Sequence, residues 1–196
     1  MSNPERLPFG TSDAEGVFVA QSSRPSGFRA LDLRLLTPFH RALLVIDGTV
    51  TQFIEAYTYE PIAVIRVRQE RQRLTRDHEW LDAVAGTEVI ARDVVLRGEA
   101  SSTLYVYGIS LTVVDRLPEG MSDQLDLAGE SIGRLLREYR VETYRELLWC
   151  GLTLPDELPM HFVDRPTNSL MSRAYRLIAN DRPVMHITEM CPVAFD

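Results

Sequence analysis

The sequence contains no lysine, few cysteines and no long apolar run. All 21 basic residues among the 196 are arginines, and 28 acidic residues give a formal net charge of −7. Because an acidic surface repels phosphate backbones, we expect no nucleic-acid partner. Cys150 and Cys191 are too few for a disulfide framework or a four-cysteine metal site. No apolar stretch approaches the roughly 18 residues of a membrane span, so we expect no membrane partner either.

Signals for export and for common cofactors are missing as well. The first residues lack the basic start and the apolar core of a signal peptide, so we expect a cytoplasmic protein. The four histidines show no His-x-His or His-Glu-x-x-His spacing, which predicts no metal site. No Gly-x-Gly-x-x-Gly, P-loop or Gly-x-Ser-x-Gly motif points to a dinucleotide, a nucleotide or α/β-hydrolase chemistry. We therefore expect a protein that works without metal or cofactor.

The composition predicts one domain of ordinary size. Hydrophobic residues make up 45% of the chain, which is enough to build a core. Residues 1–30 are rich in Pro, Ser, Gly and Asp and lack a sustained period, so we expect a mobile or surface-wrapping leader. Residues 31–196 contain no internal repeat and no interior linker, and we expect a single domain there.

The sequence contains signals for five helices. Thr37 followed by Pro38 is typical of an N-cap and a first helical residue, and this helix is expected to run through Ile46. Thr49 is the expected N-cap of a second helix, because apolar residues follow at i, i+3, i+4 and i+7 spacing. Asp77 is expected to cap another short helix. The remaining short helices are expected over 120–127 and 131–138.

Six segments have the composition and alternation of β-strands. They cover residues 61–73, 87–97, 103–114, 141–150, 173–179 and 183–191. A proline-rich loop is expected over 153–168. Because hairpin-type links join most of the strands, the sequence predicts an α+β fold with an antiparallel sheet and segregated helices.

Two charged residues occupy strand positions where apolar residues are expected. Arg92 alternates with Ile90, Val94 and Leu96, and Glu189 alternates with Met185, Ile187 and Cys191. A buried charge needs a partner, so the two residues could form an ion pair in the core. Alternatively they line a pocket, in which Arg92 binds a substrate carboxylate and Glu189 handles a proton or a hydroxyl. Both interpretations fit the spacing.

Other charged or anion-binding patterns are weaker. The arginines between Arg66 and Arg76 alternate in direction and are diluted by acidic residues, which favours a solvated edge strand over an anion site. The starts of two predicted helices, at Asp47-Gly48-Thr49-Val50-Thr51 and Ser131-Ile132-Gly133-Arg134, present free backbone N–H groups that could hold an anion. Most such helix starts bind only water.

Four of these segments, taken in order, resemble the chorismate pyruvate-lyase family. They are Asp47-Gly-Thr-Val-Thr51, Arg92 within Ala-Arg-Asp-Val-Val-Leu, Ser131-Ile-Gly-Arg134 and Ile187-Thr-Glu-Met190. The resemblance extends over residues 31–196. It implies a single six-stranded antiparallel sheet with helices packed on one side, the chorismate lyase-like fold. It also implies conversion of chorismate to 4-hydroxybenzoate and pyruvate without metal or cofactor.

The resemblance also implies roles for individual residues. Arg92 matches an arginine that binds the ring carboxylate, assisted by the backbone amides of Val50 and Ile132. The resemblance also places Thr49 among the substrate-binding residues. Glu189 matches a glutamate that contacts the ring hydroxyl and is the candidate acid or base. Two roles stay open for Glu189: it removes the C4 proton, or it only orients the hydroxyl.

Two other functions compete with this interpretation. One is a related enzyme of specialised metabolism that acts on a different substrate in the same pocket. The other is a non-catalytic module that binds a small molecule, since the same fold serves as the effector-sensing half of some transcription regulators. In all three cases the expected partner is a small molecule such as a carboxylic acid.

Overall fold

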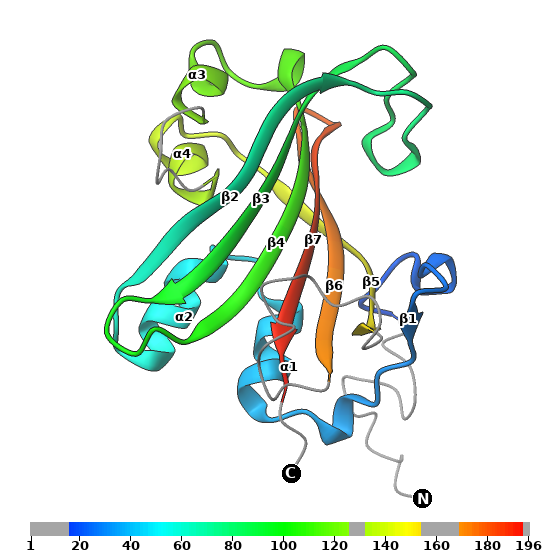
Figure 1. Ribbon diagram of the computed structural model, residues 1–196. Coiled ribbons are helices and arrows are strands. Elements are labelled where there is room, and N and C mark those ends of the chain that lie inside the picture. The colour runs from blue at the N-terminus through cyan, green and yellow to red at the C-terminus, as the bar shows by residue number, and fades with distance from the viewer. Residues whose placement is uncertain (1–15, 126–131, 154–168, 194–196) are drawn as a thin grey trace, which may run out of the picture.

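The structure, a computed structural model, describes residues 16–125, 132–153 and 169–193 (Figure 1). Within these residues, seven antiparallel strands form one sheet in the order β1-β5-β6-β7-β4-β3-β2. The strands are β1 (Phe28–Arg29), β2 (Ile62–Arg73), β3 (Glu88–Gly98), β4 (Leu104–Val113), β5 (Tyr144–Thr153), β6 (Leu170–Ala179) and β7 (Arg182–Pro192). The predicted α+β class with an antiparallel sheet is confirmed. The predicted number of six strands is one too low, because two-residue β1 is too short to show a period in the sequence.

Four α-helices and four 3₁₀ turns accompany the sheet in the described residues. They are η1 (Gln21–Ser23), η2 (Leu33–Leu35), α1 (Pro38–Val45), α2 (Val50–Thr58), η3 (Glu79–Leu81), η4 (Val114–Arg116), α3 (Met121–Leu125) and α4 (Ile132–Glu138). Thr37 caps α1 as predicted, accepting a hydrogen bond from the His40 amide. Thr49 is the N-cap residue of α2, although its side chain makes no capping hydrogen bond.

The predicted helix after Asp77 is wrong in its cap and its kind. The segment forms only the turn η3. His78 caps this turn, because its Nδ1 accepts a hydrogen bond from the Leu81 amide at 3.3 Å. The Asp77 carboxylate instead accepts the amide of Ala85 at 2.8 Å. The side chain that the sequence offers as a helix cap is therefore used to close the loop that follows η3.

The segment before α1 lies along β5. The amides of Val19 and Ala20 donate to the carbonyls of Leu147 and Leu148, at 2.9 and 2.8 Å. β1 then pairs with the far end of β5. Residues 1–15 of the expected leader, and residues 154–168 of the expected proline-rich loop, lie outside the described residues.

The α-helices cover one face of the sheet in two pairs (Figure 1). Beneath α1 and α2, the buried sheet residues include Leu96, Met171 and Cys191. Beneath α3 and α4, they include Ile90, Leu177 and Met185. Each of β3, β6 and β7 thus carries apolar residues under both pairs, and between them a charged residue: Arg92, Arg173 or Glu189. The gap between the helix pairs therefore lies over charged positions.

The edge strand β2 carries the arginine run from Arg66 to Arg73, and Arg76 follows the strand. Its arginines are exposed and make surface contacts, such as the 2.8 Å ion pair between Arg68 and Glu70. A bulge between Arg66 and Arg68 breaks the simple alternation. The prediction of a solvated edge strand is confirmed. In the described part of the chain, no helix is long and apolar enough to cross a membrane.

Candidate active site

A cavity of about 400 Å³ lies in the gap between the two helix pairs. Its floor consists of residues from β2, β3, β4, β5, β6 and β7. Its walls are the linker between α1 and α2, the start of α2, and α4 with the segment that follows it. All five residues predicted for the site line it: Thr49, Val50, Arg92, Ile132 and Glu189. The fold therefore brings together segments that are up to about 140 positions apart in the sequence. Their roles stay predictions.

The strand register places the charged groups of the floor in two neighbouring rows. Arg92 is opposite Ser110 on β4, which is opposite Ile187 on β7. Glu189 lies in the next row, opposite Gly108 on β4. Neighbouring strands are about 4.8 Å apart, so β4 separates the backbones of β3 and β7 by about 10 Å. Arg92 and Glu189 therefore face the same cavity from different places on its floor.

The possible ion pair between Arg92 and Glu189 is not formed, and Glu189 pairs with Arg173 instead. The Arg173 Nε donates to Glu189 Oε2 at 2.8 Å, from the directly opposite position on β6. The side chains are 2% and 10% exposed, respectively. Glu189 meets Arg173 rather than Arg92 because β6 is the neighbour of β7, whereas β3 is two strands away.

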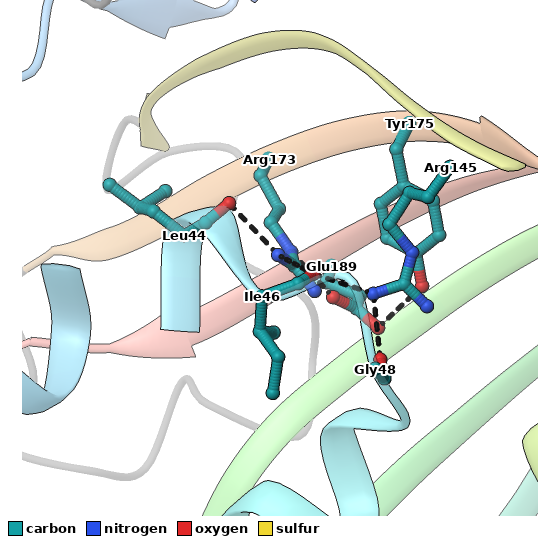
Figure 2. A network of polar contacts seen from close by, with 7 residues as sticks. All are labelled: Leu44, Ile46, Gly48, Arg145, Arg173, Tyr175 and Glu189. Carbon is teal, nitrogen blue, oxygen red and sulfur yellow. Dashed lines mark hydrogen bonds and ion pairs between the residues drawn. The ribbon is translucent and has the colours of Figure 1, made fainter. Parts of the chain in front are cut away.

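Figure 2 shows the polar network around Glu189. The Tyr175 hydroxyl donates to Glu189 Oε1 at 2.9 Å, so both carboxylate oxygens accept a hydrogen bond. The guanidinium of Arg145 lies 4.4 Å from the centre of the Tyr175 ring. Burial, reinforced by the Glu189 charge, raises the pKa of Tyr175 above its usual range, which keeps the hydroxyl protonated as a donor.

The Arg173 guanidinium is fully desolvated but stays charged. Burial by itself lowers the pKa of a guanidinium, whereas the charge of Glu189 raises it, and the net direction for Arg173 is upward. A second nitrogen, Nη1, donates to the Leu44 carbonyl at 2.9 Å. A planar guanidinium fork suits this arrangement because it can hold two acceptors in fixed directions.

The sequence analysis missed Arg145, Arg173 and Tyr175. The signal for Arg173 was the same as for Arg92, a charge among alternating apolar residues. The expected strand 173–179 begins at Arg173, so the apolar residues that precede it in the strand were not counted as its neighbours. β6 begins at Leu170, so Arg173 lies inside the strand and points with buried Met171 and Tyr175.

The starts of α2 and α4 meet at one end of the cavity. A Cβ on Gly133 would lie 2.8 Å from Thr49 Cγ2, so only glycine permits this approach without a shift. The first amides of a helix have no intrahelical acceptor, and those of Val50 and Ile132 belong to this class. Arg92, 2% exposed, reaches the same cavity from β3, and the Ser110 hydroxyl donates to its backbone carbonyl at 3.3 Å.

Chemically, the cavity has a cationic end and an anionic side. Arg92 and two helix starts suit a carboxylate, while Glu189 suits a hydroxyl that donates a hydrogen bond. Much of the remaining lining is apolar, and it includes Val64, Val94, Leu96, Val106, Leu136, Leu177 and Ile187. In the described residues, no group of three or more His, Cys, Asp or Glu is arranged to hold a metal ion.

Chorismate pyruvate-lyases from two mycobacteria are similar to this chain in sequence. The chorismate pyruvate-lyase of Mycobacterium tuberculosis (strain CDC 1551 / Oshkosh) is 28% identical over 163 residues, and the match covers 81% of each chain. The chorismate pyruvate-lyase of Mycobacterium leprae (strain TN) is 30% identical over 164 residues, covering 81% of this chain and 76% of that protein.

A solved structure shares the fold. The effector domain of PhnF from Mycobacterium smegmatis superposes with a TM-score of 0.57 at 15% identity, covering 74% of this chain and 88% of that chain. At this identity the likeness concerns the fold alone. The profile of the family described as "Chorismate pyruvate-lyase Rv2949c-like" matches residues 44–196. The predicted resemblance is confirmed, and the chain belongs to the Rv2949c-like chorismate pyruvate-lyase family.

Proposed function

We propose that this protein is a lyase that eliminates pyruvate from chorismate and leaves 4-hydroxybenzoate. The observation that carries the proposal is the placement of Arg92 and Glu189 on the floor of one cavity, at separate positions and without pairing to each other. A cyclic substrate with a carboxylate at one end and a hydroxyl at the other matches this spacing of a cation and a carboxylate. Family membership supports the reaction class.

Electrostatics orients the substrate in this proposal. The ring carboxylate binds Arg92 and the amides of Val50 and Ile132, beside Thr49, because these groups are cationic or donate hydrogen bonds. Glu189, whose charge is balanced by Arg173, accepts a hydrogen bond from the ring hydroxyl. In the reversed orientation the ring carboxylate would face Glu189, which offers it no hydrogen-bond donor, and Arg92 would lack an anionic partner from the substrate.

The elimination needs little chemical assistance. The C3–O bond to the enolpyruvyl group breaks and the C4 hydrogen leaves as a proton, so the ring becomes aromatic; a proton added at the enolpyruvyl methylene carbon completes pyruvate. The protein therefore mainly holds a dianion in the reactive geometry and excludes water. Each oxygen of Glu189 accepts one hydrogen bond and has a further lone pair, so orienting the ring hydroxyl needs no change in this network, and we assign Glu189 this role rather than removal of the C4 proton.

Incubation of purified protein with chorismate tests the proposal. We expect one pyruvate and one 4-hydroxybenzoate per chorismate, measured by a coupled dehydrogenase assay and by chromatography against 3-hydroxybenzoate as the alternative isomer. The rate is expected to be the same with and without a chelator. No turnover of chorismate, or a different aromatic product, would contradict the proposed reaction.

The fold shared with the PhnF effector domain supports a second candidate, a module that binds a small carboxylic acid without converting it. The same assay separates the two functions. A binding module would bind 4-hydroxybenzoate, detected by calorimetry, and would leave chorismate unchanged. Binding of 4-hydroxybenzoate together with release of pyruvate is the result expected of the lyase.

A further inference from the structure

Two arginines hold the chain segment that leads into α2. Arg173 Nη1 donates to the carbonyl of Leu44 at 2.9 Å, and Arg145 Nη1 donates to the carbonyls of Ile46 and Gly48, both at 2.8 Å (Figure 2). These carbonyls lie near the end of α1 and in the linker to α2, where backbone groups lack helical partners. The arginines come from β6 and β5, so the contacts tie the linker to the sheet.

The same two arginines are connected to Glu189, one directly and one through Tyr175. Arg173 binds it directly through Nε at 2.8 Å, so one guanidinium joins the carboxylate to the end of α1. Arg145 acts through Tyr175: it lies over the ring, and the Tyr175 hydroxyl donates to Glu189. A continuous set of contacts therefore connects Glu189 with the start of α2.

We propose that Arg145 and Arg173, together the arginine clamp, are positioning residues that set the distance between the Glu189 carboxylate and the start of α2 at Val50. The inference rests on the proposed function, because this distance matters for a ligand with a hydroxyl at one end and a carboxylate at the other. A planar fork with fixed donor directions holds two acceptors at a defined separation, whereas a lysine ammonium is a point charge on a flexible stem. Binding sites need their groups placed within about 0.5 Å.

The test compares a ligand that has the ring hydroxyl with one that lacks it. 4-Hydroxybenzoate and benzoate are titrated by calorimetry into the wild type, Arg173→Lys and Arg176→Lys. Arg176 is a matched control because it lies on β6, as Arg173 does, and pairs with Glu146 at 2.6 Å. Its side chain points to the other face of the sheet. We expect the wild type and Arg176→Lys to prefer 4-hydroxybenzoate, and Arg173→Lys to lose about tenfold of that preference. An unchanged preference in Arg173→Lys would overturn the proposal.

Tyr175→Phe provides a second variant in case Arg173→Lys fails to fold. It removes only the hydroxyl that donates to Glu189 and keeps the ring beneath Arg145. We expect it to lose part of the preference for 4-hydroxybenzoate, while benzoate binds as in the wild type. Equal preference in Tyr175→Phe and the wild type would count against the clamp.

Hydrogen exchange separates failure of the clamp from failure of the proposed function. If the wild type binds neither ligand, the proposed function fails, and the clamp is judged from amide exchange over residues 46–54. Arg145→Lys is then expected to exchange faster than Arg176→Lys in this segment, with similar exchange in β3 and β4. Equal exchange in the two variants would reject the clamp whatever the ligand.

Discussion

Glu189→Gln is expected to destabilise the protein strongly, because it leaves Arg173 buried without a counter-charge. The Arg173 side chain is 2% exposed, and Glu189 is its ion-pair partner at 2.8 Å. Removing one member of a buried ion pair typically costs about 3–5 kcal/mol, since the remaining charge stays desolvated. Glutamine is nearly the same size as glutamate and can still accept from Tyr175. The loss should therefore come from the charge rather than from a cavity.

Urea unfolding at pH 7 measures this effect as a lower midpoint with an unchanged slope. Glu146→Gln is the matched control: its partner Arg176 is 24% exposed and keeps more contact with water, so we expect a smaller loss than in Glu189→Gln. The double variant Glu189→Gln with Arg173→Met should recover part of the loss, because no unpaired charge remains. A loss below about 1 kcal/mol in Glu189→Gln would refute the reasoning, since an unpaired buried guanidinium must cost more.

Three further predictions concern the carboxylate end of the cavity and the opposite sheet face. Arg92→Ala is expected to weaken 4-hydroxybenzoate binding at least about tenfold, measured by calorimetry, because a charge-assisted contact to the carboxylate is lost; unchanged affinity would remove Arg92 from the site. Gly133→Ala should raise KM for chorismate, because its methyl would lie 2.8 Å from Thr49 Cγ2 and push the two helix starts apart; a wild-type KM would contradict this. Burial and nearby His78 lower the pKa of His186 to about 4 from 6.5, so the unfolded chain takes up the proton first as the pH falls. As the pH falls from 6.5 to 4, the free energy of unfolding should decrease by up to about 3 kcal/mol. The urea midpoint of His186→Gln should change less over this pH range than that of the wild type.

Local patterns in the sequence were sufficient for most secondary structure. Thr37 and Pro38 predicted the start of α1, because a cap and a proline act within one helical turn. Period-two alternation predicted the six long strands, because side-chain direction in a strand depends only on neighbouring residues. Arg92 and Glu189 stood out for the same reason, as charges on apolar faces. β1 has two residues, so it left no such pattern.

The sequence alone therefore singled out Arg92 and Glu189 as charges on apolar strand faces, and the ordered motifs it carries indicated the family. Only the tertiary structure decided which charges meet. Pairing of Glu189 with Arg173 depends on β6 being the neighbour of β7, and strand order is set by contacts between segments far apart in the chain. The contacts of Arg145 and Arg173 with the linker before α2 likewise depend on how helices pack on the sheet. Such long-range packing has no period or motif in the sequence, so only the folded chain shows it.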